Sequence, residues 1–223
     1  MKIELVVFDL DGTLVSSHET IYKATVHSLN ALKIPGELPH DQFRTRIGLH
    51  FEDIFNEFGI RLPDFEEFMK IYKSVYFDFI DSSEVYSGVV EIIQMLKKSG
   101  IKISLLTTKS QDQADKILKH FKLSSDFDYI MGRRPGLGHK PSADPLLKIC
   151  EDLSIDPANT LIVGDSEMDI QCGKNAGSST CGVAYGYRSK EDLNKEFPDF
   201  VIDNINELFN IVLNDSSINS KTG

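Results

Sequence analysis

Short apolar runs alternate with segments of helical periodicity along much of this chain. Residues 3–8, Ile-Glu-Leu-Val-Val-Phe, are mostly apolar and rich in β-branched side chains, as in a buried strand. We expect further strands at residues 102–107, 129–131 and 160–163, a short strand that ends at Val183, and a last strand at 200–202. Between them we expect helices at residues 89–98, 111–121, 143–153, 168–176 and 204–213. This alternation predicts the α/β class, with a doubly wound parallel sheet.

Residues 17–83 depart from this alternation. Their apolar positions recur at helical spacing over 18–32, 40–46, 51–58 and 64–82, and no strand pattern interrupts them. A block of this length is too long for a simple crossover between two strands. The sequence therefore predicts a discontinuous α/β core of residues 1–16 plus 84–213 and an inserted all-helical domain of residues 17–83. Residues 214–223 are mostly polar, and we expect this tail to be disordered.

The charge balance excludes some classes of partner. The 223 residues include 24 Lys and Arg against 34 Asp and Glu, which gives a formal net charge of −10. A general nucleic-acid binder needs a basic face that displaces phosphate counterions, and no run of Lys or Arg supplies one here. The same argument disfavours an anionic membrane surface. A local anion site stays possible, because a bound metal ion can reverse the sign of the charge within one cleft.

Cysteine usage and hydropathy indicate where the protein works. Cys150, Cys172 and Cys181 form neither a Cys-x-x-Cys pair nor a set with metal-ligand spacing, which favours buried thiols in a reducing compartment. The N-terminal segment carries Glu4 and reaches Asp9 too early for the apolar core of a signal peptide. No apolar run approaches the roughly 18 residues that a membrane span requires. We therefore expect a soluble, cytoplasmic protein.

Two of the predicted strands end in acidic residues. The first strand runs into residues 9–13, Asp-Leu-Asp-Gly-Thr, and strand 160–163 runs into Gly-Asp-Ser-Glu-Met-Asp at 164–169. Since the carboxyl ends of parallel strands lie at one edge of a sheet, these acids are expected to converge. In a helix, Asp165 and Asp169 would also share a face. An Asp-Gly turn and a helix cap are the simpler interpretations, but two strands that both end in Asp favour a cluster. Its oxygen ligands suit Mg²⁺.

Hydroxyl and ammonium donors occupy similar places. Thr107 and Thr108 lie at the end of the predicted strand 102–107, and Lys140 stands just before Pro141 and a predicted helix. A threonine at a strand end is more often structural than catalytic, and a lysine in a loop is more often solvated. Beside a carboxylate cluster, however, these side chains are the donors expected for phosphate oxygens.

Taken in order, these motifs resemble those of the haloacid dehalogenase superfamily. They are Asp-Leu-Asp-Gly-Thr at 9–13, Thr107 after an apolar strand, Lys140-Pro141, and Gly-Asp-Ser-x-x-Asp at 164–169. The resemblance covers essentially residues 3–213 and implies a Rossmann-like core. The helical insertion resembles the α-helical cap of the phosphoglycolate phosphatase and β-phosphoglucomutase branch. Segments 140–147 and 184–188 are also similar to the phosphoglycolate-phosphatase-like subgroup.

The resemblance implies a role for each motif. Asp9 would attack phosphorus and form an aspartyl-phosphate, and Asp11 would protonate the leaving oxygen and then deprotonate water. Mg²⁺ would be held by the Asp9 and Asp165 carboxylates and the Asp11 backbone carbonyl, with Asp169 orienting that shell. The groups implied to bind substrate phosphate are Leu10, Asp11, Thr107, Thr108 and Lys140, of which Thr107 and Lys140 also assist catalysis.

In the cap, Arg46 and Gly48 match the place of a substrate-reading loop. Arg46 could equally be a solvated charge on a helix surface, and the sequence does not decide between the two. The aromatic residues of the insertion are more consistent with a core than with a substrate pocket.

These roles predict a Mg²⁺-dependent phosphatase for a small phosphate monoester, such as phosphoglycolate, a sugar phosphate or a nucleotide. Asp11 argues against a dehalogenase, which needs no acid two residues after its nucleophile. A phosphomutase of the β-phosphoglucomutase type is an alternative, although that group commonly has Glu-Asp where this chain has Gly164-Asp165. A pyrophosphatase is another, and a non-enzymatic module is disfavoured because every motif position is intact. The expected partner is a small phosphorylated metabolite, bound by a monomer or homodimer.

Overall fold

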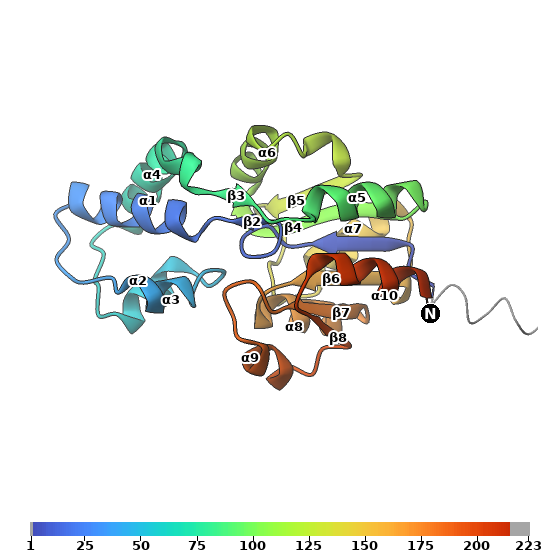
Figure 1. Cartoon of the computed structure of the whole chain (residues 1–223). Helices are drawn as coiled ribbons and strands as arrows, with labels where there is room; N and C mark the ends of the chain where they lie inside the picture. Colours follow the sequence, from blue (N-terminus) through green and yellow to red (C-terminus); the bar gives the residue numbers. More distant parts are fainter. Residues whose placement is uncertain (1, 215–223) are drawn as a thin grey trace, which may run out of the picture. The chain divides into compact units, whose positions relative to one another are not determined.

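The first predicted strand lies inside a six-stranded parallel sheet. The computed structural model describes residues 2–214, and the strands of this sheet follow the order β5-β4-β1-β6-β7-β8 (Figure 1). Their bounds are β1 Leu5–Phe8, β4 Lys102–Ser110, β5 Tyr129–Arg133, β6 Thr160–Gly164, β7 Ser179–Val183 and β8 Phe200–Ile202. The predicted α/β class and parallel sheet are confirmed.

Helices cover both faces of this sheet. They are α5 Val89–Lys98, α6 Gln111–His120, α7 Asp144–Leu153, α8 Glu167–Ala176, α9 Lys190–Lys195 and α10 Leu208–Asn214. Short 3₁₀ turns lie at Ser124–Asp126, Pro157–Asn159 and Ile205–Glu207. Helix α5 contacts α10, and α7 contacts α8. Since parallel crossovers are right-handed and the chain changes direction across the sheet at β1, these two pairs lie on opposite faces.

Burial explains why β1 has a nearly continuous apolar sequence. All four of its residues are buried, because both faces of a parallel sheet are covered. On one face, Leu5 and Val7 belong to a cluster with Ile162 of β6, Ile149 of α7 and Cys172 of α8. This packing fixes the strand whose end carries Asp9.

The described chain divides into two units, which we call the core unit and the helical unit. The core unit holds residues 2–14 and 85–214, and the helical unit is Val15–Glu84. The helical unit consists of α1 His18–Ala31, α2 His40–Arg44, α3 Phe51–Glu57, α4 Phe65–Val75 and the 3₁₀ helix η1 Tyr76–Ser82. Two short strands, β2 Val15–Ser16 and β3 Glu84–Val85, pair with each other at the ends of this segment.

Aromatic side chains form the interior of the helical unit. Phe55 and Phe68 are almost fully buried, and their ring centroids lie 5.0 Å apart in an edge-to-face arrangement. Tyr72 is also buried, and its ring contacts those of Phe68 and Tyr76. These contacts support the interpretation of the aromatic residues as packing residues.

Several elements differ from their predicted form. The segment predicted as one helix over 64–82 is α4 followed by the 3₁₀ helix η1. The sequence pattern does not distinguish them, because apolar periods of 3.6 and 3.0 residues look alike over two turns. Strand β4 continues beyond residue 107 to Ser110, with a shift in its pairing to β5 after Leu106. The sequence does not predict α9, whose one buried residue is Leu193. Asn214, the start of the predicted tail, ends α10, and residues 215–223 lie outside the described residues.

The structure also bears on the expected state of the cysteines and on the expected lack of a membrane span. All three cysteines are buried and free of disulfides. Of the helices within residues 2–214, none has both the length and the apolar character needed to cross a bilayer.

Candidate functional site

The ends of β1, β4 and β6 bring the predicted acids and donors to one edge of the sheet. Phe8 of β1 lies opposite Leu105 of β4 and Val163 of β6, so the residues that follow emerge side by side. The Asp9 N–H donates to the Val163 carbonyl at 2.9 Å, which extends the pairing of β1 with β6. Open α/β sheets bind ligands at this position, outside the carboxyl ends of the strands where the strand order reverses.

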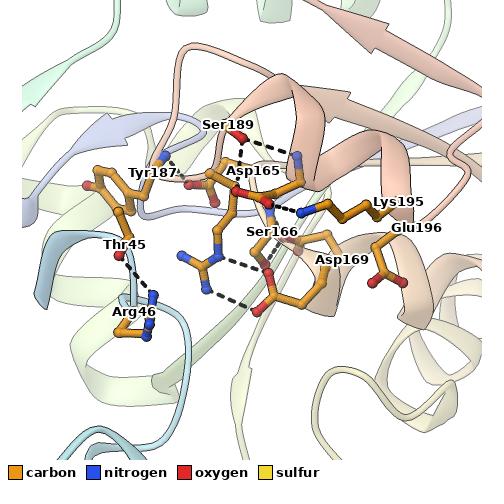
Figure 2. A network of polar contacts seen from close by, with 12 residues as sticks. Thr45, Arg46, Asp165, Ser166, Asp169, Tyr187, Ser189, Lys195 and Glu196 are labelled. Atoms are coloured by element: carbon orange, nitrogen blue, oxygen red, sulfur yellow. Dashed lines mark hydrogen bonds and ion pairs between the residues drawn. The ribbon is translucent and has the colours of Figure 1, made fainter. Parts of the chain in front are cut away.

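Asp9, Asp165 and Asp169 form a buried carboxylate cluster. One carboxylate oxygen of each lies within 4.8 Å of those of the other two, and the residues are only 7%, 3% and 1% exposed. Figure 2 shows Asp165, Ser166 and Asp169 together at the start of α8. The Ser166 N–H and hydroxyl donate to Asp169 Oδ2 at 3.2 and 2.7 Å. Asp165 lies before the first residue of α8, so Asp165 and Asp169 do not share a helix face as predicted. The turn at the N-terminal cap of α8 brings them together instead.

Lys140 links two members of this cluster. Its Nζ donates to Asp9 Oδ1 and to Asp169 Oδ1, each at 2.6 Å, and the lysine is 3% exposed. The sequence predicts a phosphate donor at this position, and the structure places that donor against the candidate nucleophile. Three carboxylates at −1 each and one ammonium at +1 leave a formal charge of −2 at the cluster.

The pKa values of the cluster reflect burial first and the surrounding charges second. Burial raises the pKa of Asp9 to about 7, against the opposing Lys140 charge and with the added effect of the Asp169 and Asp11 carboxylates. Burial, and then Asp9 and Asp169, raise the pKa of Asp165 well above its ordinary value. For Lys140, burial alone would lower the pKa, but the Asp169 and Asp9 carboxylates outweigh it and raise the pKa. A buried, oxygen-only cluster of this charge fits a divalent cation such as Mg²⁺.

Glycines leave the space that the carboxylates occupy. A Cβ atom at Gly12, where φ is +84°, would lie 2.2 Å from Asp165 Oδ2. A Cβ at Gly186 would lie 2.3 Å from Asp165 Cβ and 2.6 Å from the Gly12 carbonyl oxygen. A Cβ at Gly164 would lie 2.0 Å from Asp169 Cγ. These glycines are therefore required by the close approach of the acids, and Gly12 by its positive φ as well.

Replacing Gly186 by alanine should destabilise the protein by about 1–3 kcal/mol, because the added methyl group overpacks the space between Gly186, Asp165 and Gly12. The Asp165 side chain and the Gly12 backbone would have to move together. Urea unfolding measures the change. Gly182→Ala is the matched control, since its Cβ would approach Leu193 Cδ1 only to 3.3 Å and that side chain can adjust. Equal losses in the two variants would contradict the predicted crowding around Asp165.

The loop after β7 supports the cluster through its backbone. The Tyr187 N–H donates to Asp165 Oδ2 at 2.7 Å, as Figure 2 shows. Arg188 Nε and Nη2 donate to the two carboxylate oxygens of Glu167, at 2.9 and 3.1 Å, which ties the loop to the first residue of α8. Burial would raise the pKa of Glu167, but Arg188 outweighs it and lowers the pKa. Sequence reasoning singles out segment 184–188 without assigning it a role, because a backbone donor leaves no signal in the sequence.

Lys109 is a site residue that sequence reasoning missed. Its Nζ lies 3.2 Å from Asp11 Oδ2, and the two side chains are only 9% and 10% exposed. Lys109 belongs to the part of β4 that extends past the predicted strand, where the pairing to β5 shifts. A shift of this kind re-aims side chains, which cannot be read from periodicity. The available signal is its position two residues after Thr107.

The other predicted phosphate-binding residues also lie at this edge. Thr107 is 3% exposed, and its Oγ1 accepts a hydrogen bond from the Lys109 N–H at 3.3 Å. Thr108 is half-buried on the same strand. The Leu10 side chain is fully buried, so its backbone is the part that can reach an anion.

Arg46 and Gly48 lie in the helical unit. Arg46 Nε donates to both carboxylate oxygens of Glu57, at 3.0 and 2.8 Å, and its Nη2 donates to Oε1 at 2.6 Å. This ion pair engages the guanidinium with a carboxylate of its own unit. Gly48 follows α2 with φ +101°. Their role as substrate-reading residues stays a prediction.

Comparison with known sequences places this arrangement among related proteins. A family profile described as haloacid dehalogenase-like hydrolase matches residues 6–183. The pyrophosphatase PpaX of Bacillus cereus strain Q1 is 34% identical over 213 residues, which cover 95% of this chain and 97% of the relative. The protein of the same name from Bacillus mycoides strain KBAB4 is also 34% identical over 213 residues, with 95% and 98% covered.

Solved structures share the fold over nearly the whole chain. A crystal structure described as a predicted phosphatase from Clostridium acetobutylicum has a TM-score of 0.79 and 29% identity, and the match covers 96% of this chain and all of the other. One described as a predicted phosphoglycolate phosphatase from Haemophilus somnus has a TM-score of 0.81 and 25% identity, with 95% and 98% covered.

Proposed function

The chain belongs to the haloacid dehalogenase-like hydrolase family, and on this basis we propose that it is a Mg²⁺-dependent phosphatase whose nucleophile is Asp9. The family supports the hydrolase class, and the metal, the nucleophile and the substrate are the proposal. The observation that carries it is the cluster of Asp9, Asp165 and Asp169 with Lys140, whose formal charge of −2 favours binding of a cation.

The residues that would hold Mg²⁺ are the Asp9 and Asp165 carboxylates and the Asp11 backbone carbonyl. These groups offer oxygen ligands only, which suits a hard cation that keeps several waters. Asp169, whose oxygens accept from Ser166 and Lys140, would orient this shell. When bound, the ion would offset the carboxylate charge and withdraw electron density from the phosphoryl oxygens of the substrate.

The chain's own residues would carry the covalent steps. An Asp9 oxygen forms a bond to phosphorus as the bond to the leaving oxygen breaks, and Asp11 gives a proton to that oxygen. Asp11 then takes a proton from the water that attacks the aspartyl-phosphate, which releases inorganic phosphate and restores Asp9. Lys109 Nζ, 3.2 Å from Asp11 Oδ2, would hold the Asp11 side chain at this edge and leave Oδ1 as the oxygen that carries the proton. Thr107 and Lys140 donate to the phosphoryl oxygens, where negative charge develops.

Two substrate classes are supported to different degrees. A small phosphate monoester is what the motifs favour, because Asp11 in the proposed role would protonate an alkoxide that leaves. The names of the relatives from Bacillus cereus and Bacillus mycoides favour pyrophosphate as the second candidate. A phosphomutase is less well supported, since Gly164 occupies the position at which that group commonly has glutamate.

We interpret the helical unit as a cap that reads the part of the substrate beyond the transferred phosphoryl group. Its predominantly helical composition and its insertion between β1 and β4 support this interpretation. The buried, unbridged cysteines support a reducing location, and we keep the cytoplasm as the proposed compartment. We expect the enzyme to act on a small metabolite as a monomer or homodimer.

A phosphate-release screen tests the proposal. Purified enzyme is incubated with phosphoglycolate, sugar phosphates, nucleoside monophosphates and pyrophosphate, with Mg²⁺ present. We expect release of inorganic phosphate from at least one class, its loss in excess EDTA, and inhibition by Ca²⁺. The reason for the last is that Ca²⁺ favours more ligands and would draw both Asp9 oxygens onto the metal.

Three outcomes of the screen would count against the proposal. Full activity in excess EDTA would contradict the metal dependence. Sugar isomerisation without phosphate release would favour the phosphomutase. No turnover of any compound in the panel would remove the support for a small phosphorylated substrate.

A further inference from the structure

A second group of metal-ligand side chains lies within the helical unit, apart from the residues of the carboxylate cluster. His18 and Glu19 begin α1, and His40 begins α2. One ligand atom from each of the three lies within 4.8 Å of those of the other two. Glu19 Oε1 lies 2.7 Å from His40 Nε2 and 3.7 Å from His18 Nε2. Two imidazoles thus face one carboxylate oxygen.

The second nitrogen of each imidazole is also engaged. His18 Nδ1 lies 3.4 Å from Ser16 Oγ, and His40 Nδ1 lies 3.2 Å from Asp41 Oδ1. Each ring therefore has a partner at Nδ1 and presents Nε2 to Glu19. Histidines that bind metals have this arrangement, because a partner at the other nitrogen fixes the tautomer and the orientation of the ring.

The ring of His40 is held in place by aromatic contacts as well. The Tyr22 ring packs edge-on against it with centroids 4.6 Å apart, and the His18 ring does so at 6.0 Å. All three ligand residues are half-buried, so an ion could enter from solvent while the side chains stay largely ordered.

Local charge acts in both directions. Burial and the positive charge of Arg44 lower the pKa of His18, and a bound cation would meet the same repulsion from Arg44. The carboxylates of Glu19 and Asp41, 2.7 and 3.2 Å from the ring nitrogens of His40, carry the opposite charge and offset it. A direct hydrogen bond from His40 to Glu19 is the competing interpretation, in which the cluster only fastens α1 to α2.

We infer that His18, Glu19 and His40 form a binding site for a divalent ion of the first transition row, of which Zn²⁺ is the representative. Two imidazoles and a carboxylate are a ligand set that suits Zn²⁺ and its neighbours, whereas Mg²⁺ prefers oxygen alone. The remaining coordination positions would be filled by water or an incoming anion. This inference does not depend on the proposed phosphatase activity.

Equilibrium dialysis of untagged protein against Zn²⁺, with metal counted by mass spectrometry, tests the site. We expect wild type to bind one more equivalent of Zn²⁺ than His40→Ala or Glu19→Gln. This difference isolates the helical-unit site, whatever the core unit binds. His27→Ala is the matched control, since His27 is an exposed histidine of the same helix outside the cluster, and it should bind as wild type does.

Co²⁺ absorption supplies a second readout that does not depend on stoichiometry. Wild type and His27→Ala should show visible bands of a nitrogen-ligated site, and His40→Ala should lose them. Circular dichroism confirms that each variant is folded. Equal Zn²⁺ stoichiometry in wild type and His40→Ala, or an equal loss in His27→Ala, would overturn the inference and leave the cluster as a structural contact.

Discussion

Replacing Asp9 by asparagine is expected to reduce phosphate release by at least about a thousandfold, because an amide cannot supply the attacking oxygen of a nucleophilic step. The change removes almost no volume from a residue that is 7% exposed. It also removes one negative charge from a cluster that has an excess of it, so the fold should be retained. Initial rates with the substrate found in the screen, together with a thermal unfolding curve, measure both effects.

Asp169→Asn is the matched control for this variant. Asp169 accepts from the same Lys140 ammonium at the same distance of 2.6 Å, but its other oxygen is bound to Ser166 in the cap of α8. Changing a residue that only orients the metal ligands is expected to lower activity by about 10–100-fold. Substantial activity in Asp9→Asn, or a larger loss in Asp169→Asn, would contradict the assignment of Asp9 as nucleophile.

Lys140→Met should have the largest effect on stability, about 3–5 kcal/mol without added metal, because it leaves buried carboxylates without their cation. The methionine fills most of the space of the lysine stem, so the loss reports charge more than volume. Activity should fall as well, since a donor to the phosphoryl oxygens is missing. Urea unfolding of wild type and variant at a pH above 7 measures the difference.

The pH dependence of this difference separates charge from packing. Burial already raises the pKa values of Asp9 and Asp165, and the loss of Lys140 removes the charge that opposes the shift at Asp9. The carboxyl groups of the variant therefore take up protons in the folded state as the pH falls, and protonation removes the unpaired charge. The destabilisation by Lys140→Met should therefore be largest above pH 7 and shrink as the pH falls through about 7, the pKa that Asp9 has while Lys140 is present. A loss that is independent of pH would indicate a packing defect instead.

The sequence predicts the fold and the centre of the site for identifiable reasons. Strand β1 is buried on both faces, so its apolar run is unbroken and its end before Asp9 is well marked. The same holds for β6 and Asp165. Parallel pairing then brings their ends together without further information, which is why Asp9 and Asp165 could be placed at one edge.

Other parts of the site depend on geometry that periodicity does not contain. Lys109 reaches Asp11 because the pairing of β4 shifts near its end, and Tyr187 supports Asp165 through a backbone N–H. The contact of Glu19 with His40 joins residues 21 positions apart, across the turn from α1 to α2. Each requires the three-dimensional path of a loop, which hydrophobic patterning leaves undetermined.

Trapping of the covalent intermediate tests the central claim most directly. Wild-type enzyme is mixed with substrate and Mg²⁺, quenched in acid within one turnover, and digested for mass spectrometry. The account predicts a phosphorylated peptide that contains Asp9 and is absent from Asp9→Asn. Hydroxylamine attacks the carbonyl carbon of an acyl phosphate, so it should release inorganic phosphate from this peptide and leave a hydroxamate on Asp9. Phosphate release by wild type with no phosphoryl group on Asp9, or with the group on another residue, would contradict it.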